Sequence, residues 1–152
     1  LMRVNELIMS DTRSNMFVTM FYCVLNWRTG ELAYASAGHN PPILWRRSES
    51  RAELLRAKGV VLGIVDNATL EDGRTRLDHG DVLVLYTDGV TEPVNDQEVE
   101  FGEERLVETV AEGSTRPCAE LVQLIHERVS AFVGAQPQFD DYTLVGVKRL
   151  PE

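Results

Sequence analysis

The sequence is poor in cysteine, in long apolar runs and in positive charge, and each shortage excludes a class of protein. Its two cysteines, Cys23 and Cys118, have no metal-ligand or redox spacing, which is typical of reduced thiols in the core of a cytosolic protein. The longest apolar stretch, Met16 to Leu25, is too short and too interrupted to cross a bilayer, and no signal peptide is recognisable. Lysine and arginine number 15 against 24 aspartates and glutamates. We therefore expect a cytoplasmic protein whose segment here contacts neither nucleic acid nor a membrane.

The negative charge is concentrated in the second half of the chain. Residues 1–76 hold 10 basic and 8 acidic side chains, whereas residues 77–152 hold 5 basic and 16 acidic ones. Seven acids and no base lie between Asp88 and Glu104. Most of these acids are expected in a solvated loop, but a field of this sign also helps to retain a divalent cation nearby.

The length of 152 residues suits one domain, which we place at 1–152, with an apolar content of 43% for its core. Hydrophobic periodicity predicts seven strands and three helices. The strands are expected at Met16–Trp27, Glu31–Ala37, Ile43–Trp45, Ala52–Arg56, Arg74–Leu77, Val82–Tyr86 and Tyr142–Val147. The helices are expected at Leu1–Met9, at Glu103–Ala111, and around the apolar stripe Leu121, Leu124, Ile125, Val129 and Phe132. Strands in hairpins followed by two helices and a last strand indicate an α+β fold with mostly antiparallel sheet.

Two local details complete this expectation. We expect Arg74–Leu77 to pair with Val82–Tyr86 across the turn signal His79-Gly80-Asp81. Ser114 or Thr115 is expected to cap the last helix, because hydroxyl side chains satisfy the free N–H groups of a first turn.

The most informative segment is the apolar run Val82–Tyr86, which ends in Thr87 and then Asp88-Gly89. A rigid strand end aims a carboxylate at one point in space, as metal binding requires. Taken alone, Asp88-Gly89 is more typical of a simple turn.

A second acidic pair, Asp140-Asp141, precedes the last expected strand. If the two strands are antiparallel neighbours, Asp88 and Asp140 reach the same edge of the sheet. Carboxylates this close repel unless a cation neutralises them, and an all-oxygen site suits Mg²⁺ or Mn²⁺. Taken alone, Asp140-Asp141 is also consistent with a solvated turn.

His39 lies in the dense break Gly38-His39-Asn40-Pro41-Pro42. A general acid is conceivable there. The surrounding glycine and prolines favour a rigid bend in which the ring bonds to the backbone.

The motifs, in their order, resemble the SpoIIE-like branch of the bacterial metal-dependent (PPM-type) serine/threonine phosphatases. The resemblance covers nearly the whole chain, and its specific motifs are Ala37–Pro42 and Tyr86–Glu92 in combination. The other matching segments are Phe17–Tyr22, Gly30, Leu62-Gly63, Gly80-Asp81, Phe101-Gly102, Arg105-Leu106 and Asp140–Leu144.

The resemblance implies an antiparallel β-sandwich flanked by helices, with two Mn²⁺ or Mg²⁺ ions held on aspartates. The ions share a water that attacks phosphoserine or phosphothreonine, lowering the pKa of that water and shielding the phosphoryl oxygens. By match of motif, Asp88 and Asp140 are expected to be metal ligands, Asp141 a further ligand candidate, and Gly89 to leave room at the metal rim. The implied substrate is a bacterial regulatory phosphoprotein such as an anti-sigma-factor antagonist, and a sensor domain is expected upstream in the parent chain.

One family motif has no counterpart in this sequence. Family members carry an earlier Gly-Asp-Val-x-Gly-His-Gly segment whose aspartate bridges both metals, so the chain resembles the last two thirds or so of the domain. We therefore expect weak metal occupancy and weak or absent activity of these residues alone. A catalytically degenerate phosphatase fold that binds a signalling partner is the alternative function, and a homodimer that covers exposed sheet edges is a further expectation.

Overall fold

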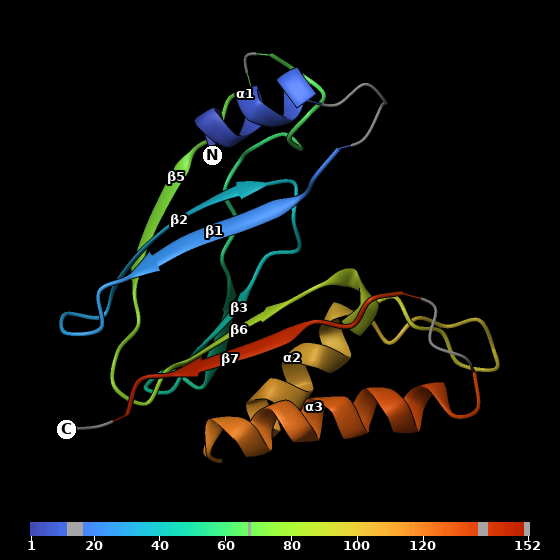
Figure 1. Cartoon of the computed structure of the whole chain (residues 1–152). Coiled ribbons are helices and arrows are strands. Elements are labelled where there is room, and N and C mark those ends of the chain that lie inside the picture. Colours follow the sequence, from blue (N-terminus) through green and yellow to red (C-terminus); the bar gives the residue numbers. More distant parts are fainter. Residues whose placement is uncertain (12–16, 67, 137–139, 151–152) are drawn as a thin grey trace. The chain divides into compact units, whose positions relative to one another are not determined.

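The structure is a computed structural model that describes residues 1–11, 17–66, 68–136 and 140–150 (Figure 1). Contacts divide the chain into two compact units. The first unit comprises Leu1–Pro41 with Leu55–Arg76, and the second comprises Pro42–Leu54 with Leu77–Glu152. The assignment of 1–152 to one domain stays a prediction.

The first unit is a three-stranded antiparallel sheet in the order β1-β2-β5, accompanied by helix α1. Its elements are α1 (Met2–Asp11), β1 (Met20–Leu25), β2 (Glu31–Ala37) and β5 (Asp72–Arg76). The β1–β2 hairpin closes through Gly30, whose φ of 79° is a conformation that favours glycine. Helix α1 is joined to the unit by buried Asn5, which donates to the Val65 carbonyl (2.8 Å) and accepts from the Gly63 N–H (2.9 Å).

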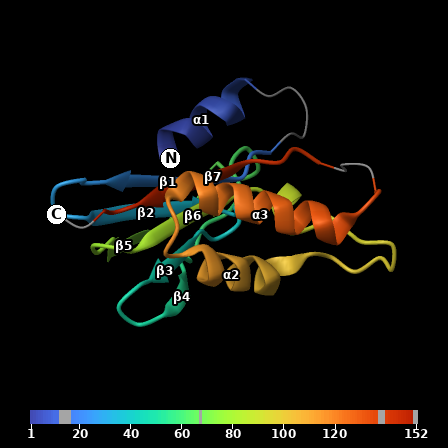
Figure 2. The same cartoon turned by 90° about the horizontal axis from the view of Figure 1, so that it is seen from below.

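The second unit is a four-stranded antiparallel sheet in the order β4-β3-β6-β7 with two helices packed on it (Figures 1 and 2). Its elements are β3 (Ile43–Arg46), β4 (Arg51–Leu54), β6 (Val82–Tyr86), the 3₁₀ turn η1 (Asp88–Val90), α2 (Gly102–Gly113), α3 (Cys118–Val133) and β7 (Leu144–Lys148). The expected stripe of α3 faces the core, where Leu121 and Ile125 pack with Val82 and Val84 of the sheet. Strand β6 is central and buried, so it holds its C-terminal end rigidly.

The turn before β6 is fixed by the buried carboxylate of Asp81, which is 2% exposed. It accepts a hydrogen bond from the Arg46 guanidinium (3.1 Å) and others from the backbone N–H groups of Arg47 (2.9 Å) and Asp78 (3.1 Å). Arg46 also binds Glu53 on the neighbouring strand β4. The start of β6 is therefore tied to β3 and β4 rather than to β5.

This arrangement corrects two local predictions. Strand β5 pairs with β2 in the first unit, so the expected pairing of Arg74–Leu77 with Val82–Tyr86 is wrong. Pro117 occupies the N-cap position of α3, and the Ser114 hydroxyl instead donates back to the Ala111 carbonyl at the end of α2.

Other predictions hold in part. Cys23 and Cys118 are free thiols, but both are half-buried rather than core residues. The sequence Asp11-Thr12-Arg13-Ser14-Asn15 predicts a loop after α1, and most of it lies outside the described residues. None of the helices in the described ranges is long and apolar enough to cross a membrane. Over the residues that the structure describes, two antiparallel sheets and three α-helices confirm the α+β class.

Candidate metal centre

Strands β6 and β7 bring the predicted acidic residues to one end of the second sheet. The strands are antiparallel neighbours, with Tyr86 opposite Leu144 at the end of the ladder. Asp88 follows β6 by two residues, and the acidic pair 140–141 precedes β7. The conditional expectation that the two acidic segments share a sheet edge is therefore met.

Three hydrogen bonds continue the ladder beyond the two strand ends. The Thr87 N–H donates to the Thr143 carbonyl (3.1 Å). The Thr87 hydroxyl donates to the Asp141 carbonyl (3.0 Å) and accepts from the Thr143 N–H (3.0 Å). Thr87, which precedes Asp88, is thus hydrogen-bonded directly to Asp141 and Thr143, which follow Asp140.

Gly89 brings the two acidic turns into close backbone contact. A Cβ at residue 89 would collide with the carbonyl group of Asp141 and lie 3.3 Å from the Tyr142 nitrogen. Any larger residue at position 89 would push the turn that carries Asp88 away from the segment that carries Asp140 and Asp141. The glycine is needed here for close approach.

Both leading aspartates are oriented by the next residue in the chain. One carboxylate oxygen of Asp88 accepts the Gly89 N–H (3.0 Å), and one of Asp140 accepts the Asp141 N–H (2.7 Å). Asp88 is half-buried, whereas Asp140 and Asp141 are exposed. Carboxylates fixed in this way at adjacent strand ends are the oxygen donors that a hard divalent cation prefers.

The described residues supply only part of such a centre. Over the described ranges, no group of three or more histidine, cysteine, aspartate or glutamate side chains is placed to hold a metal ion. The donors present fit Mg²⁺ or Mn²⁺ in kind, and Gly89 provides the close approach, but a complete ligand set needs more donors than these carboxylates.

Two residues at this site were not predicted from the sequence to have a role. Thr87 joins the strand ends, and its sequence signals are its place between the apolar run and Asp88 and its inclusion in the motif Tyr86–Glu92. Tyr142 has a buried hydroxyl without a hydrogen-bond partner among the described residues, and burial raises the pKa of its phenol to about 12. Its ring meets the His126 ring edge to face, with centroids 5.6 Å apart. Neither contact is visible in local sequence.

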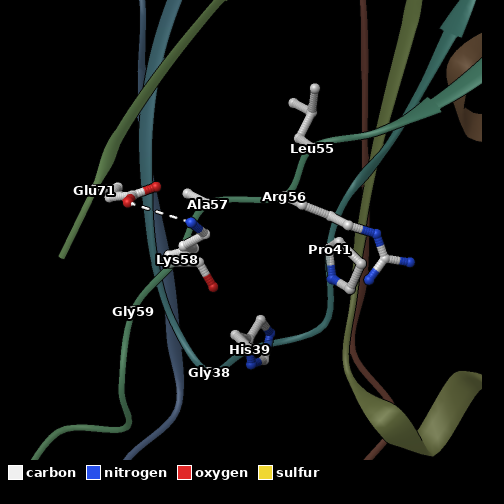
Figure 3. A pocket seen from close by; sticks show the side chains of 10 residues that line it. Gly38, His39, Pro41, Leu55, Arg56, Ala57, Lys58, Gly59 and Glu71 are labelled. Carbon is white, nitrogen blue, oxygen red and sulfur yellow. Dashed lines mark ion pairs between the residues drawn. The ribbon is translucent and has the colours of Figure 1, made fainter.

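His39 lies elsewhere, in a pocket of the first unit that Figure 3 shows from close by. Its Nδ1 atom is 3.0 Å from the Thr19 hydroxyl, so the predicted bond to the backbone is wrong. The pocket measures about 550 Å³ and is also lined by Arg56, Lys58 and Glu71. Lys58 and Glu71 form a loose ion pair of 4.0 Å, drawn as the dashed line. The pocket therefore carries charged side chains of both signs, and its cations are partly balanced by an acid.

Comparison with known proteins gives a consistent result. The family model described as Stage II sporulation protein E (SpoIIE) matches residues 1–150. The chain is 32% identical over 134 residues to Protein IcfG of Synechocystis sp., covering 88% of this chain and 21% of that protein. It is 30% identical over 149 residues to Phosphoserine phosphatase RsbU of Bacillus subtilis, covering 98% of this chain and 44% of that protein.

A solved structure shares the fold. The phosphatase domain of the cell fate determinant SpoIIE from Bacillus subtilis, in a Mn-presoaked form, superposes with a TM-score of 0.71 at 17% sequence identity. The match covers 99% of this chain and 73% of that one. This likeness confirms the predicted PPM-type fold class. The chain spans less than half the length of the two curated relatives.

Proposed function

Because the chain belongs to the SpoIIE family, we propose that it forms part of a metal-dependent phosphatase that hydrolyses phosphoserine or phosphothreonine on a bacterial regulatory protein. The observation that carries the proposal is the pairing of β6 with β7, which brings Asp88 and Asp140 to one sheet end. Carboxylates at one sheet end can be neutralised by a divalent cation held between them.

Asp88 and Asp140 are proposed to hold the divalent ions, with Asp141 as a further ligand candidate. The oxygen-only donor set supports Mn²⁺ or Mg²⁺. Two such ions, when bound, would lower the pKa of the attacking water and neutralise the phosphoryl oxygens. The chain's own contribution is positional: Thr87 joins the two strand ends, and Gly89 lets the two acidic turns approach.

The substrate and partners are proposed from the family relationship. RsbU is named as a phosphoserine phosphatase, and by likeness to it we propose a phosphorylated regulatory protein, such as an anti-sigma-factor antagonist, as the substrate. A sensor domain in the same polypeptide is part of this proposal. A cytoplasmic location and a homodimer stay predictions.

Phosphate release from a phosphoserine peptide and from a phosphothreonine peptide tests the proposed activity. The full-length native protein is expected to release phosphate when Mn²⁺ is present and to stop when a chelator removes it. Asp140→Asn removes one proposed ligand while keeping the size of the side chain, and it should abolish turnover. Release that continues with chelator present, or that Asp140→Asn leaves at the wild-type rate, would refute the metal role.

A second candidate function is a degenerate phosphatase fold that binds a signalling partner without catalysis. It is favoured by the absence of a three-donor metal cluster within the described residues. If the full-length protein neither binds Mn²⁺ nor releases phosphate but captures an unphosphorylated regulatory protein, this second function is correct.

A further inference from the structure

A second, larger pocket lies in the other unit, beside the acidic turn of β6. It measures about 740 Å³, within the range of ligand-binding pockets. Val129, Val133 and Tyr142 form part of its wall, and Gly89 contributes the side nearest the proposed metal ligands. Every lining residue belongs to the second unit.

The wall of this pocket is apolar but includes one unsatisfied polar group. Val129 is 5% exposed and belongs to the hydrophobic core, against which Val133 and Tyr142 pack. The Tyr142 hydroxyl is buried and has no hydrogen-bond partner among the described residues. Such a group costs free energy, so this wall is not optimised for the stability of the fold alone.

The rim of the pocket is acidic. Among the described residues, Glu92 and Glu100 line it, and no lysine or arginine does. Both lie in the stretch from Asp88 to Glu104 that holds seven acids and no base. A ligand that enters here meets only negative formal charges, so an anion is disfavoured and a cation is attracted.

The loop that carries this rim is held in a defined shape. The Asn95 side chain accepts hydrogen bonds from the N–H groups of Gln97 and Val99, both at 3.0 Å. Val94 and Glu100 form an isolated bridge, and Glu98 adopts a φ of 58°, which non-glycine residues seldom do. The loop and the C-terminal end of α3 lie at the same end of the unit (Figures 1 and 2). The rim acids are therefore presented before a ligand arrives, which lowers the entropy cost of binding.

We propose that this pocket docks a partner protein through a large apolar side chain next to a lysine or arginine. The apolar side chain packs against Val129 and Val133, and the cation is held between Glu92 and Glu100. This docking site does not depend on the proposed phosphatase activity, because none of its contacts requires a bound metal.

Methyl NMR of the full-length protein, with a short peptide as the probe, tests the proposal. We expect acetyl-Phe-Arg-amide to shift the methyl signals of Val129 and Val133 with a dissociation constant on the order of 1 mM. The charge-reversed acetyl-Phe-Glu-amide is expected to shift neither signal.

Two double variants that change the net charge equally distinguish direct contact with the probe from the general electrostatic field of the acidic loop. Glu92→Gln with Glu100→Gln should weaken the Phe-Arg probe about fivefold or more, because both carboxylates line the pocket. Asp96→Asn with Glu98→Gln alters the same loop outside the pocket lining and should leave the affinity unchanged.

Three results would overturn the docking proposal. These are no methyl shift at about 20 mM probe, equal shifts by the two peptides, and equal weakening by the two double variants. All three are read without metal or substrate, so they are independent of whether the phosphatase proposal succeeds.

Discussion

The hydroxyl of Thr87 donates a hydrogen bond to the carbonyl of Asp141, 3.0 Å away, and so joins the turn after β6 to the turn before β7. The two residues are 54 positions apart in sequence. The same hydroxyl accepts the Thr143 N–H at 3.0 Å, so one side chain satisfies two backbone groups of the facing strand. The relative placement of the two acidic turns depends on this small group.

Thr87→Val tests that dependence. The substitution keeps the shape of the side chain but removes the hydroxyl, so one backbone donor and one acceptor lose their partner. We expect the free energy of unfolding to fall by about 1–2 kcal/mol and Mn²⁺ affinity to fall with it. Urea unfolding with and without Mn²⁺ measures both. Thr87→Ser retains the hydroxyl and should behave much more like wild type; equal losses in the two variants would show that the methyl group matters instead.

Gly89→Ala tests the close approach of the two acidic turns. The added Cβ collides with the Asp141 carbonyl group, which is backbone and cannot rotate away. We expect a loss of about 1–3 kcal/mol in unfolding free energy, together with weaker Mn²⁺ binding measured by calorimetry.

Gly102→Ala is the matched control for this variant. Nothing lies within 4 Å of a Cβ at Gly102, but its φ of 80° makes alanine strained by about 1–2 kcal/mol. The control should therefore lose stability and keep its Mn²⁺ affinity. If Gly89→Ala also kept wild-type affinity, close backbone contact would not be part of the metal centre.

Asp81→Asn tests the anchor at the other end of β6. The neutral side chain loses the ion pair with Arg46, whose side chain is only 13% exposed. We expect a cost of about 1–2 kcal/mol in chemical unfolding, because hydrogen bonds to the buried guanidinium weaken while its ion pair with Glu53 remains. Mn²⁺ affinity should not change, because Asp81 precedes β6 whereas Asp88 follows it. Glu49→Gln breaks the exposed ion pair with Arg51 and should cost less than about 0.5 kcal/mol. Similar costs for the two variants would show that the Arg46–Asp81 pair is no more buried than the Arg51–Glu49 pair.

The two thiols should react slowly near neutral pH. Burial raises the pKa of Cys23 and of Cys118 above 9.0, although the charge of Lys148 partly opposes the rise for Cys118. The thiolate is the reactive form, so iodoacetamide should label both more slowly than it labels a free cysteine peptide at pH 8. Mass spectrometry of the labelled peptides gives the two rates, and peptide-like rates would show that the thiols are not desolvated.

The raised pKa values of the two thiols also determine how the stability of the protein changes with pH. The unfolded thiols lose their protons first, near pH 9, so the unfolded state binds fewer protons than the folded state above that pH. The contribution to stability is complete below pH 9 and is lost as the pH rises through the higher folded values. Serine variants of both cysteines should lack this decline.

Local patterns predicted the elements well and their partners less well. The boundaries of β2, the apolar stripe of α3 and the antiparallel pairing of β6 with β7 all follow from periodicity and from the order of strand and acid. The partner of β5 does not, because the turn signal at residues 78–81 is equally compatible with a hairpin. Asp81 is instead bound by Arg46 and the Arg47 backbone, which lie 35 and 34 residues away.

In the candidate site, too, the placement of residues was predictable from the sequence and their long-range contacts were not. The placement of Asp88 and Asp140 at one sheet end was predicted from the order of strand and acid, and their role as metal ligands stays a prediction. The contacts of Thr87 and Tyr142 depend on residues more than 15 positions away, and no local rule indicates them. The prediction that Ser114 caps α3 is wrong for a related reason, since the Ser114 hydroxyl donates to the Ala111 carbonyl at the end of α2.

The central claim is that Asp88 helps to hold a divalent cation, and Mn²⁺ titration calorimetry of the full-length protein tests it most directly. Asp88→Asn and Asp96→Asn change the charge equally within the same acidic stretch, but only the first lies at the shared end of β6 and β7. The account predicts that Asp88→Asn weakens Mn²⁺ binding at least about tenfold, while Asp96→Asn binds like wild type. Wild-type Mn²⁺ affinity in Asp88→Asn would contradict it.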